Sequence, residues 1–410
     1  MKHWIGRKDY IDKLLSYREK GMIKVVTGLR RSGKSTLLEL FRNRLSQSGV
    51  LQEQIIFYDF ELPESYLGKT WDSLYFEIKA KLPSEKISYI FLDEVQNIKD
   101  FEKLVDGLYA TANTDVYITG SNANLLSGEL ATLLSGRYIE ISILPFSFYE
   151  YLQAREIDTA NKYLNYEMLF FDYVNETSMP KGVELRDGGF DKVYEYLEFL
   201  YATVVEKDIM KRHTIYDKRA FGNVTKFIAG NIGNQVSPSS ISKSLKADNQ
   251  DIHHTTVENY LAYLTESFMF YQVNRFDIKG KNQLATQEKY YIVDLGFLNV
   301  LTGREKTTDR GHILENIVYL ELLRRGYKVW TGSLRNAEVD FVVKNKFGDI
   351  EYYQVSWNID NEKTLEREFN PLETIKDNYP KFLLTTDSFP QNRKGITHMN
   401  VFEWLLHQQT

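Results

Sequence analysis

A glycine-rich motif constrains the fold of this chain more than any other feature of the sequence. Residues Gly28–Ser35 read GLRRSGKS, which fits the pattern G-x-x-x-x-G-K-[ST]. The motif follows the apolar run Met22–Gly28 and precedes a helical pattern that begins at Thr36. A glycine-rich loop between a strand and a helix points backbone N–H groups and the helix dipole at a phosphate. The motif therefore predicts a phosphate site in an α/β fold.

The side chains of the motif predict ATP and Mg²⁺ as its ligands. Lys34 is placed to reach the β- and γ-phosphates, and the Ser35 hydroxyl is placed to ligate Mg²⁺. Arg30 and Arg31 flank the loop and could contact phosphate or a neighbouring subunit. The full set of predicted nucleotide-binding residues in the loop is Gly28, Arg30, Arg31, Ser32, Gly33, Lys34, Ser35 and Thr36.

A second motif, YIFLDEVQ at Tyr89–Gln96, places two acids directly after an apolar run. Asp93 is predicted to hold the metal, directly or through water, and Glu94 to orient or deprotonate the attacking water. The alternative is that the two acids only cap the next helix. Their position downstream of the phosphate loop favours the catalytic interpretation.

Short apolar runs alternate with helical patterns over residues 1–150, which indicates a parallel sheet with helical crossovers. The runs are Met22–Gly28, Ile55–Phe60, Tyr89–Asp93, Val116–Gly120 and Tyr138–Leu144. Ser121 and Asn122 follow the fourth run and could lie near the γ-phosphate, although Ser121 could instead cap a helix. Arg137 precedes the fifth run and could stabilise phosphate charge or be an ordinary surface arginine.

The chain resembles archaeal-type and bacterial AAA+ ATPases that carry a conserved domain of unknown function behind the ATPase. The residues that carry the resemblance are Ile5–Arg7, Val25–Leu38, Phe91–Gln96, Ile118–Leu126, Leu134–Tyr138 and Leu144–Tyr151. The resemblance implies that the acid strand lies beside the sensor strand, that Glu94 is the catalytic glutamate and that Arg7 lies near the adenine. The segment Asn175–Pro180 lacks the glycine pair that the family often has there, so the resemblance does not define the lid.

The middle of the chain, residues 151–305, is predicted to be a helical lid and a winged helix. Three helical patterns, the last over Thr255–Ser267, precede two strand-like runs between Phe268 and Asp294. A winged helix can place its third helix in the major groove of DNA. The lysines and arginines of this module are balanced by acids, so DNA contact and an interdomain packing role both remain open.

The C-terminal region, residues 306–410, resembles the PD-(D/E)XK nuclease core. Glu315 and Asp340 match its helix acid and its strand acid. Gln354 and Ser356 stand where the family has an acid and a lysine, which removes one ligand charge and the activating cation. We therefore expect a structural or binding domain without nuclease activity, unless Lys344 or Lys346 compensates.

Composition bounds the remaining possibilities. The chain has 410 residues, a net charge of −5 and no cysteine. Disulfides and thiolate metal sites are thus excluded, and we expect a cytoplasmic protein without a signal peptide or a membrane span. A homo-oligomer is a candidate assembly because ATPases of this kind often take an arginine from a neighbour. The alternatives to an ATPase are a nucleotide-dependent DNA-binding switch with little turnover and an ATP-gated nuclease.

Overall fold

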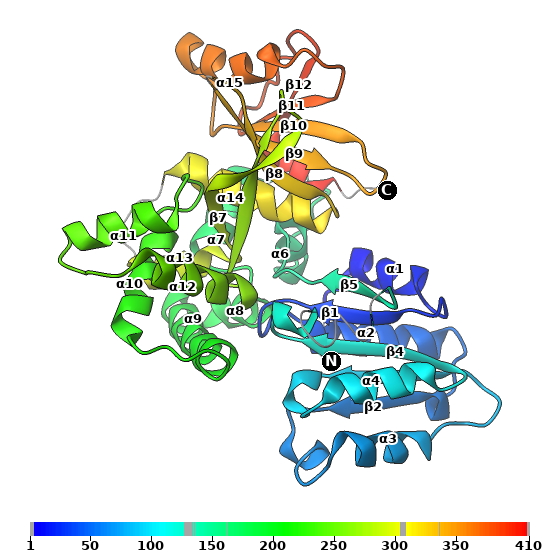
Figure 1. Ribbon diagram of the computed structural model, residues 1–410. Helices are drawn as coiled ribbons and strands as arrows, with labels where there is room; N and C mark the ends of the chain where they lie inside the picture. Colours follow the sequence, from blue (N-terminus) through cyan, green and yellow to red (C-terminus); the bar gives the residue numbers. More distant parts are fainter. Residues whose placement is uncertain are drawn as a thin grey trace. The chain divides into compact units, whose positions relative to one another are not determined.

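The computed structural model describes residues 4–126, 134, 136–161, 163–303, 309–335 and 337–407 (Figure 1). The chain forms two compact units, which are residues 1–144 with 266–268, and residues 145–265 with 269–410. The linker predicted near Thr302–Asp309 lies mostly outside the described residues. Within the described residues, no helix has both the length and the apolar character needed to cross a bilayer.

The first unit is built on a five-stranded sheet in the order β2-β3-β4-β1-β5, in which every neighbouring pair is parallel. This confirms the predicted parallel α/β sheet, and it also confirms that the acid strand β3 lies beside β4. The strands are β1 (Ile23–Thr27), β2 (Ile55–Asp59), β3 (Ser88–Asp93), β4 (Thr114–Gly120) and β5 (Tyr138–Ser142). The helices are α1 (Lys8–Ser16), α2 (Lys34–Gln47), α3 (Trp71–Lys79) and α4 (Phe101–Ala110).

Helices cover both faces of this sheet, which explains why its strands are almost wholly apolar. Leu37 and Phe41 of α2 pack with Phe91 and Tyr117 on one face, and α1 joins the same core. On the other face the apolar sides of α3 and α4 pack against the opposite side chains of β3 and β4. The central strands β1, β3 and β4 are therefore packed on both faces.

The second unit begins with helices and continues into a three-helix group followed by a β-hairpin. This order of elements is the one expected from the sequence, and the winged helix itself remains a prediction. The first helices are α6 (Phe148–Ala154), α7 (Tyr166–Asn175), α8 (Pro180–Leu185) and α9 (Phe190–Val204), and α9 continues into a π-helical turn over Val205–Met210. The three-helix group is α10 (Lys218–Ala229), α11 (Pro238–Ala247) and α12 (His254–Glu266). The hairpin is β6 (Phe270–Asp277) and β7 (Asn282–Ile292).

The β6–β7 hairpin belongs to the same seven-stranded sheet as the C-terminal strands β8 to β12, so this sheet extends across residue 305. The order is β12-β11-β10-β9-β8-β6-β7, and β6 pairs with β8 over Arg275–Asp277. The division into domains at residue 305 remains a prediction. The strands are β8 (Lys328–Ser333), β9 (Glu338–Lys344), β10 (Ile350–Val355), β11 (Lys381–Thr385) and β12 (Ile396–Asn400).

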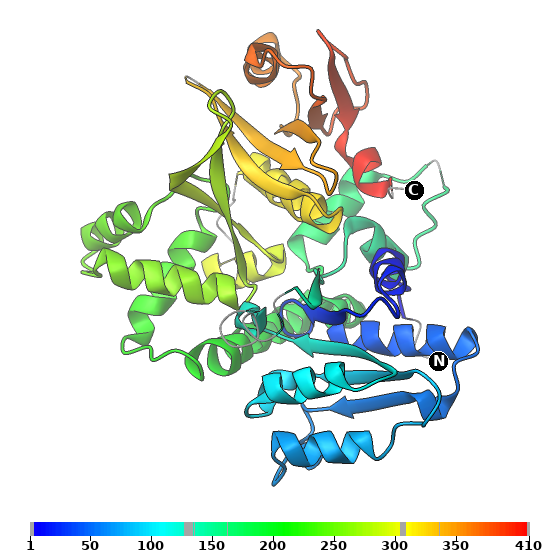
Figure 2. The same ribbon diagram turned by 45° about the vertical axis from the view of Figure 1, so that its right-hand side comes forward.

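Four helices accompany this sheet. They are α13 (Leu295–Thr302), α14 (Arg310–Arg324), α15 (Glu362–Thr374) and α16 (Val401–Leu406). α14 packs against β7, β8, β9 and β10 (Figure 2), and α15 packs against β9 to β12. The final strand and helix, β12 and α16, were not predicted from the sequence.

Candidate functional site

The glycine-rich loop joins the carboxyl end of β1 to the amino end of α2, where the sequence motif predicts it. Gly28 has a φ of 144° and Gly33 has a φ of 104°, in the region that favours glycine. A Cβ at Gly28 would lie 2.3 Å from the carbonyl oxygen of Ile143. The backbone of the loop is thus fixed by both conformation and close packing. The Ser32 hydroxyl is buried in this loop and has no hydrogen-bond partner among the described atoms.

Lys34, the first residue of α2, is buried and lies under the loop. Its ammonium donates to the carbonyl oxygens of Gly28 at 3.2 Å and Leu29 at 3.3 Å. It also forms an ion pair with Glu94, with 3.2 Å between Lys34 Nζ and Glu94 Oε1. The two predicted residues, which are far apart in the sequence, are therefore in direct contact.

Asp93 ends β3 and is almost fully buried. Its carboxylate accepts hydrogen bonds from the hydroxyl groups of Ser35 and Thr119. Burial raises the pKa of Asp93 to about 6, while the two hydroxyl donors oppose this rise. Ser35 and Asp93, the predicted metal ligands, are brought together by α2 and β3.

Glu94 follows Asp93 with a left-handed backbone, φ 53°, and its N–H donates to Thr119 Oγ1 at 2.8 Å. The Gln96 amide nitrogen donates to Glu94 Oε2 and, at 3.3 Å, to Ser121 Oγ. Burial alone would raise the pKa of Glu94, but Lys34, Arg30 and the Gln96 amide lower it below its usual value. Glu94 is therefore an ionised carboxylate with both oxygens engaged.

Gln96 and Thr119 were not among the residues predicted for the site. Both are polar residues that border the predicted acids within the quoted motifs Phe91–Gln96 and Ile118–Leu126, and this was the only signal for them. In the structure they join the ends of β3 and β4, because each bonds to Asp93, Glu94 or Ser121.

Arg7 is buried and supports the loop through its guanidinium group. Nη1 donates to the carbonyl oxygen of Ser32 at 3.1 Å, and Nη2 donates to that of Leu144 at 2.8 Å. The guanidinium also lies 4.7 Å from the centre of the Tyr10 ring. These contacts make Arg7 a support of the phosphate loop, and its predicted position near adenine remains a prediction.

The other predicted residues divide into those near the loop and one that is distant. Arg30 pairs with Glu61 at 2.8 Å, while Arg31 is exposed with a φ of 67°. Thr36 lies in the first turn of α2, and Asn122 is buried after β4.

Arg137 is the distant residue. It precedes β5 at the amino end of the sheet, is exposed and pairs with Asp106 at 3.1 Å. The structure does not bring it to the other predicted residues, because β5 runs parallel to β1 and the phosphate loop follows the opposite end of β1.

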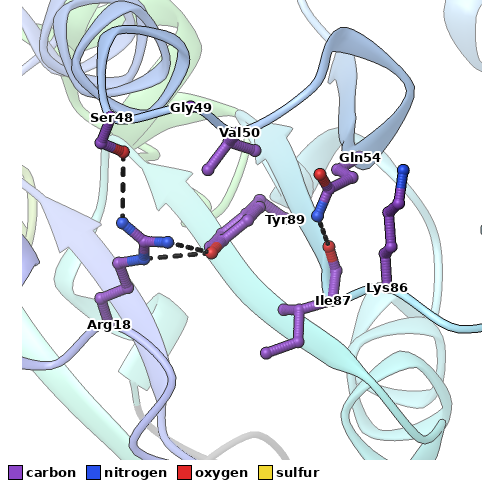
Figure 3. Close-up of a pocket in the computed structure, with 8 residues that line it drawn as sticks. All are labelled: Arg18, Ser48, Gly49, Val50, Gln54, Lys86, Ile87 and Tyr89. Atoms are coloured by element: carbon purple, nitrogen blue, oxygen red, sulfur yellow. Dashed lines mark hydrogen bonds between the residues drawn. The ribbon is translucent and has the colours of Figure 1, made fainter.

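A pocket in the first unit lies away from these residues. Its volume is about 310 Å³, and Figure 3 shows its lining. Arg18 donates to the Tyr89 hydroxyl at 2.6 Å, and Tyr89 lies near the amino end of β3. The phosphate loop follows the carboxyl end of β1, so this pocket is separate from the candidate site. The lining residues are Arg18, Ser48, Gly49, Val50, Gln54, Lys86, Ile87 and Tyr89.

The acids predicted for a nuclease-like site lie in the second unit among groups that already bind them. Glu315 of α14 pairs with Lys289 of β7 at 2.8 Å. Asp340 of β9 accepts a hydrogen bond from the Val355 N–H at 2.8 Å, and burial together with Glu315 raises its pKa well above the usual range. Within the described residues, no group of three or more histidines and acids is arranged to hold a metal ion.

Gln354 and Ser356, which stand where the predicted nuclease core would have an acid and a lysine, make hydrogen bonds within the second unit. The Gln354 amide donates to Glu368 Oε2 at 2.9 Å, and the Ser356 hydroxyl donates to the Asn358 carbonyl oxygen at 3.1 Å. Lys344 and Lys346, which could have compensated, are exposed. Lys289, which the sequence did not single out, forms ion pairs with Glu315 and Glu338.

Comparisons with known proteins match two parts of the chain to family models and most or all of the chain to relatives. Residues 20–152 match a family described as an AAA domain, and residues 169–308 match a domain of unknown function, DUF8612. A Haemophilus influenzae protein described as uncharacterized is 40% identical over 408 residues, which is 99% of each chain. The uncharacterized protein MJ1544 of Methanocaldococcus jannaschii is 30% identical over 87% of this chain and 79% of its own.

Among solved structures, the Walker-type ATPase PABY2304 of Pyrococcus abyssi is similar with a TM-score of 0.49 and 18% identity. The match covers 73% of this chain and 96% of that one.

Proposed function

The chain belongs to the family that includes these Haemophilus and Methanocaldococcus relatives and carries an AAA domain, and we propose that it binds ATP with Mg²⁺ and hydrolyses it. One observation supports this proposal most strongly. Lys34 begins α2, whereas the adjacent Asp93 and Glu94 lie at the carboxyl end of β3, and all three are buried beside the glycine-rich loop. Burying a charged side chain costs folding free energy unless the charge is paired with another group or with a ligand. The convergence of these three side chains therefore indicates a site for a charged ligand.

The donor set around Asp93 fits Mg²⁺. The Ser35 hydroxyl and the Asp93 carboxylate are oxygen ligands, and they hydrogen-bond to each other. When bound, the metal would neutralise charge on the β- and γ-phosphates. We assign Ser35 and Asp93 as the residues that hold it, with Thr119 fixing the orientation of Asp93.

Glu94 is proposed as the group that orients and deprotonates the attacking water. Its lowered pKa keeps the carboxylate ionised near neutral pH, as a base requires. Lys34 must turn from Glu94 towards phosphate when ATP binds, which frees Glu94 Oε1. The loop N–H groups and the Ser32 hydroxyl would bind phosphate oxygens.

The affinity for ATP tests whether Lys34 binds phosphate, on which the rest of the proposal depends. The Kd of a fluorescent ATP analogue should rise at least about tenfold in Lys34→Ala, because one charged hydrogen bond to phosphate contributes about 1.5–3 kcal/mol. Lys13→Ala, which removes a lysine on α1 outside the loop, is the matched control. Equal affinities in Lys34→Ala and the wild type would refute the proposal.

A nucleotide-held switch with little turnover is the second candidate, and one observation favours it. Both oxygens of Glu94 are engaged, Oε1 by Lys34 and Oε2 by Gln96. If the Gln96 contact persists with ATP bound, water activation would be slow. A burst of a single turnover without steady hydrolysis would identify this case.

We propose two candidate partners, which are DNA and a second copy of the chain. DNA is a candidate partner for the α11–α12 pair, where Thr255, Glu258 and Asn259 of α12 are exposed. The hairpin is the least suited part, because β6 is paired with both β7 and β8. Arg137 is proposed to act on nucleotide only from a second copy in a homo-oligomer, since its own loop is at the other end of the sheet. Duplex DNA added to a hydrolysis assay and sedimentation with ATP would test these two partners.

A further inference from the structure

Lys289 brings a positive charge into a group of acids that come from other elements of the second unit. Its ammonium lies 2.8 Å from Glu315 Oε1 of α14 and 2.6 Å from Glu338 Oε1 of β9. Lys289 is 5% exposed and Glu315 is equally buried. We call Glu315, Glu338 and Asp340 the acid cluster.

Other contacts hold the lysine and the cluster together. Tyr291, two residues after Lys289 on β7, donates its hydroxyl hydrogen to Glu315 Oε1. Residues two apart on a strand point to the same face, so β7 presents both groups to α14. Asn316 of α14 completes the junction with two bonds to the backbone of Ile292, at 2.8 Å to its N–H and 2.9 Å to its carbonyl oxygen.

The Lys289 ammonium occupies the place where a divalent cation would bind to the acid cluster. Two carboxylate oxygens from different elements converge within 3 Å of Lys289 Nζ, and Asp340 acts on the same lysine electrostatically. Oxygen ligands converging from several elements are what Mg²⁺ and Mn²⁺ use in proteins. One buried ammonium and one divalent cation cannot share that point.

We propose that Lys289 is the resident cation of the acid cluster, where it excludes divalent metal and fastens the β6–β7 hairpin to α14. The second unit then has no metal-dependent nuclease chemistry. Its acids serve instead as an ionic junction between the hairpin and the C-terminal strands. This inference does not depend on the proposed ATP site, which lies in the first unit.

Binding of Mn²⁺ alone, measured by electron paramagnetic resonance without nucleotide, tests the proposal on the full chain. Wild type should show no Mn²⁺ site that depends on Asp340. Lys289→Ala vacates the point and leaves room for an ion with its waters, so it should bind Mn²⁺ at least about tenfold more tightly. Asp340→Asn in the Lys289→Ala background should weaken that new site.

Two results would overturn the proposal. One is a wild-type Mn²⁺ site that Asp340→Asn abolishes, with plasmid cleavage lost in Lys289→Ala, because Lys289 would then be a catalytic lysine. The other is a folded Lys289→Ala protein that binds no additional Mn²⁺.

A second pair of variants keeps the proposal testable if Lys289→Ala does not fold. Lys289→Met leaves Glu315 buried and unpaired, so its melting temperature should fall by several degrees. Lys289→Met with Glu315→Gln removes that unpaired charge and should regain most of the loss. Failure of the pair to regain stability over Lys289→Met alone would contradict the role of Lys289 as the counter-ion of Glu315.

Discussion

Lys34 Nζ lies 3.2 Å from Glu94 Oε1, and both side chains are almost fully buried. The residue proposed to bind phosphate and the residue proposed to activate water are therefore ion-pair partners. Because ATP would compete with Glu94 for the same ammonium, nucleotide binding and the release of Glu94 are expected to be coupled.

This ion pair predicts how the first unit responds to loss of one charge. Lys34→Met leaves Glu94 buried without its partner, which typically costs about 3–5 kcal/mol of unfolding free energy. Lys34→Met with Glu94→Gln removes both charges and should recover most of that loss. Urea unfolding of the two variants measures the difference, and equal stabilities would show that the pair contributes nothing.

Gln96 is expected to position Glu94, because its amide connects Glu94 to Ser121. Gln96→Ala should lower kcat for ATP hydrolysis roughly tenfold and leave KM within about twofold, since no contact with phosphate is lost. Gln96→Glu places a second carboxylate beside Glu94 and should move the acidic limb of the pH–rate profile to higher pH. The exposed Gln52→Ala serves as control. An unchanged kcat in Gln96→Ala would remove Gln96 from the mechanism.

Arg7 is expected to act through the shape of the phosphate loop. Its two guanidinium nitrogens reach carbonyl oxygens of Ser32 and Leu144, and a lysine ammonium cannot span both. Arg7→Lys should therefore weaken ATP binding about as much as Arg7→Ala, by roughly tenfold, corresponding to about 1.4 kcal/mol. Arg44→Ala, at an exposed position of α2, is the comparison. Retained affinity in Arg7→Lys would mean that a single contact is enough.

The raised pKa of Asp93 predicts that the stability of the first unit depends on pH, and it fixes the sign of that dependence. The pKa of Asp93 is about 6 in the folded protein and 3.8 in an unperturbed carboxyl, so the folded state binds the proton more tightly. Asp93 therefore destabilises the fold increasingly as pH rises from about 4 to about 6, by at most about 3 kcal/mol for a shift of about two units.

Asp93→Asn removes the buried charge. The unfolding free energy of Asp93→Asn minus that of the wild type should therefore increase as pH rises across that range in the absence of nucleotide. Urea unfolding at intervals from pH 4 to 7.5 measures the gain, with the exposed Asp12→Asn as control. A difference between Asp93→Asn and wild type that stays constant with pH would contradict the raised pKa.

The sequence predicted the first unit well because its signals are local. The phosphate motif, its flanking strand and helix, and the acid pair each lie within a short segment, and parallel strands bring their carboxyl ends together. Arg137 shows the limit of this reasoning. Its motif left a phosphate contact open, but Arg137 precedes β5 and therefore lies at the amino end of the parallel strands, whereas the phosphate loop follows the carboxyl end of β1.

Lys289 could not have been predicted because its role depends on tertiary contacts. It lies 26 residues from Glu315 along the chain, in a strand whose pattern gave no reason to expect a buried charge. The sequence predicted the two acids and the loss of the usual lysine. It did not reveal that Lys289 of the hairpin forms ion pairs with Glu315 and Glu338.

Steady-state ATP hydrolysis with Mg²⁺, compared between wild type and Glu94→Gln, tests the central claim most directly. Glutamine keeps the shape of Glu94 and its contact with Gln96 but cannot accept a proton from water. We predict measurable turnover in the wild type, a fall of at least about a hundredfold in Glu94→Gln, and retained ATP binding in both proteins. Turnover in Glu94→Gln equal to that of the wild type would contradict the proposed site.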